Sequence, residues 1–269
     1  MAAKKKRASA GTPSKNVVAA ARAGGGARTA ASRGALWENV KSLLGAVLIF
    51  LVIRTFLIEA YRIPSGSMIP TLLVGDWLFV NKLVYGPHLP FTDINLPGYG
   101  APHRGDVVVF ESPPQHDQPW DLTPTLVKRL VGLAGDTLYM RNDLLHVNGM
   151  EQRQGYAAQE RAKGDPNYYH PAFEWQRPYE LKSSRFPAPL PRPTLGNWGP
   201  IVIPPGHYFM LGDSRHESKD GRYWGLVPRK NFRARPLFVY YSYRGGDEKR
   251  RPLPALTDIR FGRIGTRIR

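Results

Sequence analysis

The pattern of apolar and polar positions separates a continuous apolar segment near the amino terminus from a long body of short apolar runs. Residues 42–53 carry no charge, and with its flanks the apolar segment extends from Leu36 to Ile58. As a helix, a segment of this length measures about 35 Å and can cross a hydrocarbon core of about 30 Å. A buried helix and a cleaved signal peptide are the alternatives, but no convincing small-x-small cleavage site follows before Tyr61. We therefore predict a transmembrane anchor at residues 36–58.

The body beyond residue 58 consists of short β-branched or aromatic runs that alternate with turn signals such as Gly-Asp and Asn-Gly. Strands are predicted at Trp77–Val80, Asp106–Phe110, Leu126–Leu130, Thr137–Arg141, Ile201–Ile203, Tyr208–Leu211 and Leu237–Ser242. No helical periodicity is found after Ile58, and residues 151–200 are polar and rich in proline. The pattern predicts a mostly antiparallel β body in which residues 151–200 form an insertion.

The positive charge of the chain is concentrated towards its ends. Lys and Arg total 38 against 21 Asp and Glu, a formal net charge of +17. Residues 1–35 hold eight basic and no acidic side chains among Ala, Gly and Ser, so we predict a disordered tail. An excess of basic residues before a membrane helix favours a cytoplasmic tail and an exported body. Residues 244–269 are also basic and are predicted to form a mobile tail.

Several classes of chemistry find no support in the sequence. The chain has no cysteine, which excludes thiol catalysis and disulfides, and its seven histidines form no H-E-x-x-H pair that would bind zinc. No P-loop, G-x-G-x-x-G, G-x-S-x-G or S-x-x-K motif occurs. We therefore expect no metal ion and no other cofactor. His216 lies near two aspartates, but we expect a solvated loop histidine rather than a member of a Ser-His-Asp triad.

Two segments contain residue types that can perform nucleophilic catalysis. The segment P-S-G-S-M-I-P-T at residues 64–71 is a constrained loop, because its prolines fix φ and Gly66 permits a close backbone approach. A serine held there can act as a nucleophile beside backbone N–H groups, although an ordinary serine-rich turn is the alternative. Lys128 interrupts an apolar strand, and burial would lower its pKa towards neutrality, where a free amine can accept a hydroxyl proton. A lysine in such a strand can instead extend its amine to solvent. Strand alternation places Arg129 on the opposite face.

Five motifs occur in order between about Tyr61 and Pro228. They are P-S-G-S-M-x-P-T, G-D-x-x-x-V-x-K, R-G-D-V-V-V-F, V-K-R-L-V-G-L-x-G-D and G-D-S-R-x-x-S-x-D-x-R-Y-W-G. In this order, after an amino-terminal apolar segment, they resemble the bacterial type I signal peptidase (leader peptidase) family. The motifs leave residues 152–200 uncovered.

The resemblance implies a catalytic pair of serine and lysine. Ser67 matches the family's nucleophile, and Lys128 matches its general base. Ser65 matches the residue that completes the oxyanion hole with the Ser67 backbone N–H, and Ser218 matches the hydroxyl that orients the lysine amine. Four further residues match the ion-pair framework that holds the site: Asp213, Arg215, Asp220 and Arg222.

The resemblance also implies two pockets for small side chains of an extended substrate. The pocket for the residue before the cut would be shaped by Ile63, Pro64, Leu72, Leu126 and Val127. The pocket for the residue two positions earlier would be lined by Tyr61, Leu78, Val109 and Val127. The family often has an aromatic residue where this chain has Leu126, so the shape of the first pocket is expected to differ.

Fold, activity and location follow from the resemblance as expectations. Residues 59–243 should form a catalytic domain of coiled antiparallel β-sheets with an inserted second lobe at about 151–200, preceded by one transmembrane helix. The implied activity is that of a membrane-bound serine endopeptidase, which removes signal peptides from exported preproteins after a small-x-small motif. Its partners would be secretory preproteins and membrane phospholipid, near the translocation machinery, with no nucleic acid. The expected location is the bacterial inner membrane, with a cytoplasmic amino terminus and a periplasmic catalytic domain.

Two alternative functions and one further expectation complete the sequence analysis. A peptidase of the same clan with a narrow substrate, such as a conjugation-pilin processor, would share every motif. A membrane-associated nucleic-acid binder would use the net charge of about +8 on residues 59–269, but it leaves Ser67 and Lys128 without a role. Five large apolar side chains lie near Ser67: Leu72, Leu73, Trp77, Leu78 and Phe79. Some of them are expected to line the pockets or to pack in the core, and the remainder to form an exposed rim that enters the membrane.

Overall fold

The three-dimensional structure is a computed structural model of the chain. It describes residues 37–90, 92, 94–115, 119–152, 165–244 and 254–269. The disordered tail predicted at residues 1–35 therefore lies outside the described residues. The chain divides into two compact units, Met1–Val52 and Ile53–Arg269.

An apolar helix occupies Trp37–Leu57, with a mean hydropathy of 2.1. By length and composition this helix can cross a membrane, and none of its most apolar stretch is buried against protein. Its carboxyl-terminal end is a π-helix, η1 (Ile53–Leu57), which belongs to the second unit. The helix ends one residue before the predicted boundary, because Ile58 is the first residue of strand β1.

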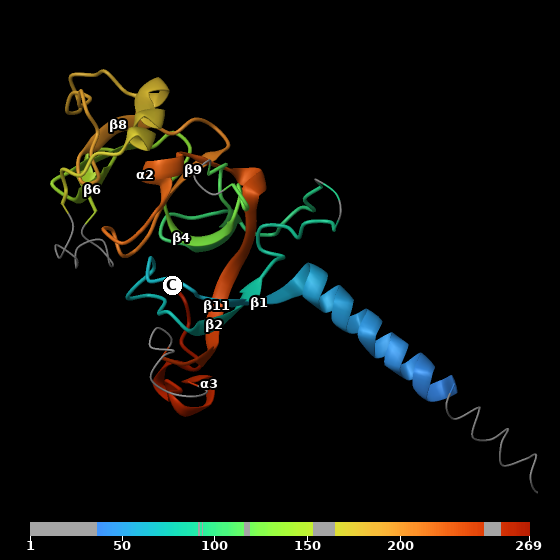
Figure 1. Cartoon of the computed structure of the whole chain (residues 1–269). Coiled ribbons are helices and arrows are strands. Elements are labelled where there is room, and N and C mark those ends of the chain that lie inside the picture. The colour runs from blue at the N-terminus through green and yellow to red at the C-terminus, as the bar shows by residue number, and fades with distance from the viewer. Residues whose placement is uncertain (1–36, 91, 93, 116–118, 153–164, 245–253) are drawn as a thin grey trace, which may run out of the picture. The chain divides into compact units, whose positions relative to one another are not determined.

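The second unit is built from two antiparallel sheets, as the sequence predicted, and Figure 1 shows strand β4 strongly curled. The larger sheet has the order β1 (Ile58–Arg62), β2 (Asp76–Asn81), β11 (Phe232–Ser242), β3 (Val107–Glu111), β4 (Thr125–Gly132), β9 (His207–Leu211), β10 (Val227–Pro228). The smaller sheet has the order β7 (Met150–Glu151), β6 (Leu144–Val147), β5 (Thr137–Arg141), β8 (Trp198–Val202). The short helices are η3 (Pro171–Tyr179), α2 (Gly221–Trp224), η4 (Arg229–Asn231), α3 (Pro254–Thr257) and η5 (Phe261–Arg263).

Strand alternation on β3 and β4 creates two apolar clusters on opposite faces of the larger sheet, because Val109 pairs with Val127 and Phe110 with Leu126. The first cluster comprises Tyr61, Ile63, Met68, Leu72, Leu78, Val80, Val107, Val109, Val127, Ala234, Val239 and Ile268. The second cluster comprises Val84, Tyr85, Val108, Phe110, Leu126, Leu130, Leu133, Tyr208, Met210, Trp224, Val227 and Phe232. On β4, Lys128 lies between Leu126 and Leu130, which belong to the second cluster, whereas the adjacent Val127 belongs to the first.

A third cluster joins the two sheets. It includes Val131 of β4, Phe209 of β9 and Ile201 of β8, and two aromatic residues of η3, Trp175 and Tyr179, pack against it. The helix η3 lies within the polar, proline-rich stretch for which the sequence showed no helical period. It is a 3-10 helix that begins with Pro171 at its first turn and is capped by His170. The boundaries of a second lobe at 151–200 stay a prediction.

All seven predicted strands are present, but four further strands of the described residues were not predicted from the sequence. Strand β6 follows a two-residue turn at Asn142 and Asp143, whose φ values are 50° and 64°. Two consecutive left-handed residues are typical of a tight hairpin turn, for which Asn and Asp are favoured. Strands β7 and β10 are only two residues long, and β1 follows directly on the apolar helix.

The basic carboxyl-terminal segment is not the mobile tail that the sequence suggested, as far as residues 254–269 are concerned. Thr266 accepts a hydrogen bond from the backbone N–H of Val239, and Ile268 is buried in the first cluster. Arg263 forms an ion pair with Asp76, which is fully buried at the start of β2. A buried carboxylate requires charged or polar partners, and the carboxyl-terminal segment supplies Arg263 as such a partner for Asp76. The positive charge of the segment therefore does not keep the segment in solvent.

Candidate active site

Ser67 and Lys128 meet in the structure, although 61 residues separate them in sequence. Ser67 lies in the loop between β1 and β2, and Lys128 lies in the middle of β4. The Lys128 Nζ is 2.5 Å from the Ser67 Oγ, and both side chains are buried, with 4% and 9% of the residue exposed. The alternative in which Lys128 extends to solvent is therefore wrong. The alternative of an ordinary serine-rich turn at residues 64–71 is wrong as well, because Ser67 is buried and contacts Lys128.

The environment of Lys128 favours its neutral form. Burial lowers the pKa of the Lys128 amine from 10.5 to about 8, while the carboxylates of Asp220 and Asp213 oppose this shift. A neutral amine has a lone pair that can accept the hydroxyl proton of Ser67. The arrangement can therefore convert a serine hydroxyl into a nucleophile near neutral or mildly alkaline pH.

Asp220 and Arg222 form a buried ion pair beside this amine. Arg222 donates from Nε to Asp220 Oδ1 at 2.8 Å and from Nη2 to Asp220 Oδ2 at 2.9 Å. The carboxylate also caps α2 and accepts the N–H of Gly212 at 3.0 Å. Burial alone would raise the pKa of Asp220, but Arg222 and the Gly212 N–H hold it below its usual range. This carboxylate is therefore ionised and fixes the loop that carries the last motif.

Arg215 is buried in the same loop. Its Nε donates to the carbonyl oxygen of Gly212 at 2.9 Å, and among the described residues its Nη1 has no hydrogen-bond partner. Burial and the nearby Arg222 lower the pKa of Arg215 to about 10. Arg215 thus lies within the expected framework, and its side chain stabilises the backbone of the loop at Gly212.

Arg129 is a site residue that the sequence analysis did not identify. Its Nε and Nη2 donate to Asp213 Oδ1 and Oδ2 at 2.7 and 2.8 Å, and Thr71 Oγ1 donates to Asp213 Oδ2 at 2.5 Å. A further bond runs from Arg129 Nη1 to the carbonyl oxygen of Arg269 at 3.1 Å. The sequence analysis had placed Arg129 on the opposite face of the strand from Lys128. It had also left Asp213 without a named basic partner, and that missing partner was the signal that could have identified Arg129.

Ser218 and Ser65 lie close to Ser67 in space or in sequence. A Cβ at Gly212 would lie 2.1 Å from the Ser218 Oγ and 2.6 Å from the Ser67 carbonyl oxygen, so only glycine fits at this contact. The Ser218 Oγ is buried and has no hydrogen-bond partner in the part of the chain that the structure describes. Ser65 is exposed. Their assigned roles, towards the lysine amine and the oxyanion, stay predictions.

The structure brings most of the predicted pocket residues together. Six of them belong to the first cluster, next to Met68: Tyr61, Ile63, Leu72, Leu78, Val109 and Val127. Pro64 is exposed at the start of the Ser67 loop. Leu126 is not brought together with them, because it faces the second cluster on the other side of β4.

One other sequence expectation is corrected by the structure. The side chain of His216 is buried rather than solvated, and its Nε2 lies 3.6 Å from Oδ1 of Asp143 in the hairpin turn before β6. Of the five apolar side chains near Ser67, Leu72 and Leu78 are fully buried in the first cluster, so the exposed rim stays a prediction for the other three. Leu73, Trp77 and Phe79 are half-buried, and Phe79 stacks on Tyr240 with ring centroids 4.2 Å apart.

Comparison with known proteins identifies the family to which this β-sheet protein and its buried serine–lysine contact belong. Residues 36–241 match the family described as signal peptidase, peptidase S26. The chain therefore belongs to the signal peptidase S26 family. This match begins one residue before the apolar helix and ends in β11, so it includes the described site.

Individual relatives agree with this assignment. A protein named signal peptidase I from Pseudomonas aeruginosa is 36% identical over 244 residues, which cover 86% of this chain and 78% of the relative. Signal peptidase I of Bacillus licheniformis is 30% identical, with 78% of this chain and 91% of the relative covered. A crystal structure of a signal peptidase I from Enterococcus faecalis covers 50% of this chain and 96% of its own at 27% identity, with a TM-score of 0.33. The family assignment accordingly rests on the sequence matches.

Proposed function

We propose that this protein is a membrane-bound serine endopeptidase that removes amino-terminal signal peptides from exported preproteins. The observation that carries the proposal is the buried contact between Ser67 Oγ and Lys128 Nζ. Membership of the signal peptidase S26 family supports both the reaction and the substrate class.

The proposed reaction uses Ser67 as the nucleophile and Lys128 as the base. The neutral amine accepts the Oγ proton as Oγ attacks the scissile carbonyl carbon, which forms a tetrahedral oxyanion. The Ser67 N–H and the Ser65 hydroxyl would donate hydrogen bonds to this oxyanion. Lys128 then passes its proton to the departing amine, which leaves an ester between the signal peptide and Ser67. Water, deprotonated by the same amine, hydrolyses the ester and restores the hydroxyl.

Selection of the cleavage site is proposed to depend on the first cluster. Side chains one and three positions before the cut point to the same side of an extended chain, so both can contact one apolar surface. Tyr61 and Val127 are the half-buried members of that surface, while Leu78 and Val109 of the same cluster are fully buried. Because these residues are closely packed, the surface leaves room only for small side chains, which is the basis for the proposed small-x-small preference.

The location is proposed to be the bacterial inner membrane. The helix Trp37–Leu57 would be a single span, with the basic residues before it in the cytoplasm and the catalytic domain in the periplasm. Membrane phospholipid and proximity to the translocation machinery are part of this proposal, because the substrates emerge there.

The test of this function is cleavage of a general secretory preprotein by the purified full-length chain in detergent. We expect processing after the small-x-small motif, and we expect Ser67→Ala and Lys128→Ala each to reduce the rate by several orders of magnitude. Lys82→Ala serves as a control, since it removes a partly buried lysine that pairs with Glu59 instead. Processing by Ser67→Ala at the wild-type rate would refute the proposal, and loss of activity in His216→Ala alone would reassign the base.

A further inference from the structure

Thr71 lies four residues after Ser67 and joins the nucleophile loop to three other parts of the chain. Its Oγ1 donates to Asp213 Oδ2 and accepts a hydrogen bond from Arg129 Nη2 at 3.1 Å. Its carbonyl oxygen accepts a hydrogen bond from Arg263 Nη2 at 2.9 Å. Asp213 belongs to the loop after β9, Arg129 to β4 and Arg263 to η5. Segments that are far apart in sequence therefore meet at this one residue.

A short turn connects Thr71 to the nucleophile. The backbone N–H of Leu72 donates to the carbonyl oxygen of Met68 at 2.9 Å, so residues 68–72 form one closed turn directly after Ser67. Met68 and Leu72 are buried in the first cluster, which packs this turn against the sheet. Because the turn is closed and packed, a displacement of Thr71 also displaces Ser67.

The backbone of Ser67 is also joined directly to the loop after β9. The carbonyl oxygen of Ser67 accepts the backbone N–H of Ser214 at 3.1 Å. Asp213, the preceding residue, accepts hydrogen bonds from Thr71 and from Arg129 of β4. These contacts fix the position of the nucleophile relative to β4, which is the strand that carries the proposed base.

Arg263 supports this arrangement from the carboxyl-terminal segment. Its Nε donates to Asp76 Oδ1 at 3.1 Å, and its Nη2 donates both to Asp76 Oδ2 and to the Thr71 carbonyl oxygen. Asp76 is fully buried and also accepts the backbone N–H of Leu73 at 2.9 Å. A guanidinium has several donors in one plane, so one side chain can bind the carboxylate and the carbonyl oxygen at once. The single nitrogen of a lysine lacks this geometry.

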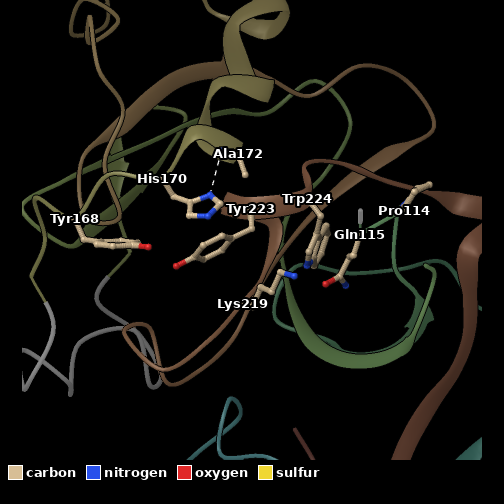
Figure 2. Close-up of a pocket in the computed structure, with 8 residues that line it drawn as sticks. All are labelled: Pro114, Gln115, Tyr168, His170, Ala172, Lys219, Tyr223 and Trp224. Carbon is tan, nitrogen blue, oxygen red and sulfur yellow. Dashed lines mark hydrogen bonds between the residues drawn. The ribbon is translucent and has the colours of Figure 1, made fainter. Parts of the chain in front are cut away.

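The loop after β9 borders open space where it continues beyond Ser218. A cavity of about 430 Å³ lies there, and its lining in Figure 2 includes Lys219, Tyr223 and Trp224. A cavity supplies no packing contacts, so it fixes its border less firmly than a filled core would. The buried hydrogen bonds of the loop, including those at Asp213, therefore determine its position.

We propose that Thr71 and Arg263 are positioning residues for the nucleophile, which together hold Ser67 Oγ within hydrogen-bond distance of Lys128 Nζ. The inference rests on the proposed function, because it concerns the same reaction. It gives the carboxyl-terminal segment a role in that reaction, although the segment lies outside the five motifs and beyond the residues 36–241 that match the family.

The first test separates the hydroxyl of Thr71 from its shape, with the full-length enzyme in detergent and a peptide substrate. Thr71→Val keeps the shape but removes the hydroxyl, whereas Thr71→Ser keeps the hydroxyl. Below the melting temperature of each variant, Thr71→Val should lose about tenfold or more in kcat with little change in KM. Thr71→Ser should keep kcat within about twofold of the wild type. Wild-type kcat in Thr71→Val, or an equal loss in Thr71→Ser, would overturn the role of the hydroxyl.

The second test compares Arg263→Lys with Arg260→Lys as a matched control. Both arginines lie near Asp76, and their side chains are 20% and 21% exposed, but Arg260 donates to the carbonyl oxygen of Val74 instead of that of Thr71. Each variant keeps a cation beside the buried carboxylate, so their melting temperatures should be similar. Only Arg263→Lys should lose about tenfold in kcat. Equal kcat in the two variants would show that Arg263 has no positioning role.

The combined variants test whether the two residues act through the same contacts. Thr71→Val together with Arg263→Lys should lose less kcat than the product of the two single losses, whereas Thr71→Val together with Arg260→Lys should lose that product. A simple product in both cases would contradict joint action. The wild type is measured in the same assay. A wild type that cleaves nothing would refute the proposed function, whereas an active wild type with unaffected variants would refute only the positioning roles.

Discussion

Arg129 binds Asp213 through two parallel hydrogen bonds, of 2.7 and 2.8 Å, while the adjacent Lys128 contacts Ser67. Neighbouring residues of a strand point to opposite faces, so β4 presents one cation to each side of the site. The guanidinium ties the strand to the loop after β9, whereas the buried amine can lose its proton. The fork of an arginine suits the first role, and the single amine of a lysine suits the second.

This division of roles predicts the effect of Arg129→Lys. The variant keeps the charge but loses the two-bond geometry with Asp213, and therefore the fixed position of the loop that carries Ser218 and Asp220. We expect kcat to fall about tenfold or more while KM changes little, measured on a peptide substrate with the melting temperature followed in parallel.

The matched control for Arg129 is Arg104→Lys. Arg104 also pairs with a mostly buried carboxylate, Asp136, at 2.6 Å, but its own side chain is more exposed than that of Arg129. Equal losses of kcat in the two variants would show that ion pairing supports the fold generally and that Arg129 has no special role in positioning the site.

The lowered pKa of Lys128 predicts the pH dependence of activity. The amine must be neutral to act as a base, and its pKa of about 8 makes it about one-tenth neutral at pH 7 and about nine-tenths neutral at pH 9. We expect kcat/KM on a peptide without titrating groups to rise about tenfold per pH unit below pH 8 and to level off above it. A profile that is flat between pH 6 and 9 would contradict Lys128 as the base.

The same shift predicts how stability responds to pH. The unfolded lysine has a pKa near 10.5 and the folded one a pKa of about 8, so between these values the unfolded state binds more protons and stability rises with pH. Below pH 8 both states are protonated, and the folded state carries a buried charge. Lys128→Met should therefore be more stable than wild type at pH 7, and this advantage should diminish towards pH 10.5, as measured by denaturant unfolding.

The alternation of β4 also predicts which residue controls substrate selection. Val127 faces the first cluster, and shortening it to alanine should enlarge the pocket, so that a larger side chain three positions before the cut is accepted. Leu126 faces the second cluster, and Leu126→Ala should lower the melting temperature without changing selectivity. The comparison of cleavage rates for Ala, Val and Leu at that position decides between them. A change of selectivity in Leu126→Ala alone would instead support its sequence-based assignment to the pocket.

The sequence predicted those parts of the site that are encoded locally. Seven strands were recognised from short β-branched runs, and Ser67 and Lys128 were recognised from two motifs. The partners of Asp213 and the burial of His216 depend on contacts between distant loops, which periodicity does not report. The alternation that separates Lys128 from Arg129 also separates Leu126 from Val127, so Leu126 packs against the second cluster, and its place in the pocket stays a prediction.

Ile268 provides the last prediction, because the basic carboxyl-terminal segment was expected to be mobile. Its side chain is 9% exposed and packs in the first cluster with Ile63 and Met68, which flank the Ser67 loop. Ile268→Ala should cost about 2 kcal/mol of unfolding free energy, since it leaves a cavity in that cluster. Ile264→Ala, in the same segment but 44% exposed, should cost far less. Ile268→Ala should also reduce kcat at temperatures where it is fully folded, because the cavity loosens the packing beneath Met68. Denaturant unfolding and peptide cleavage of both variants measure these effects, and equal stability of the two would show that the segment does not support the site.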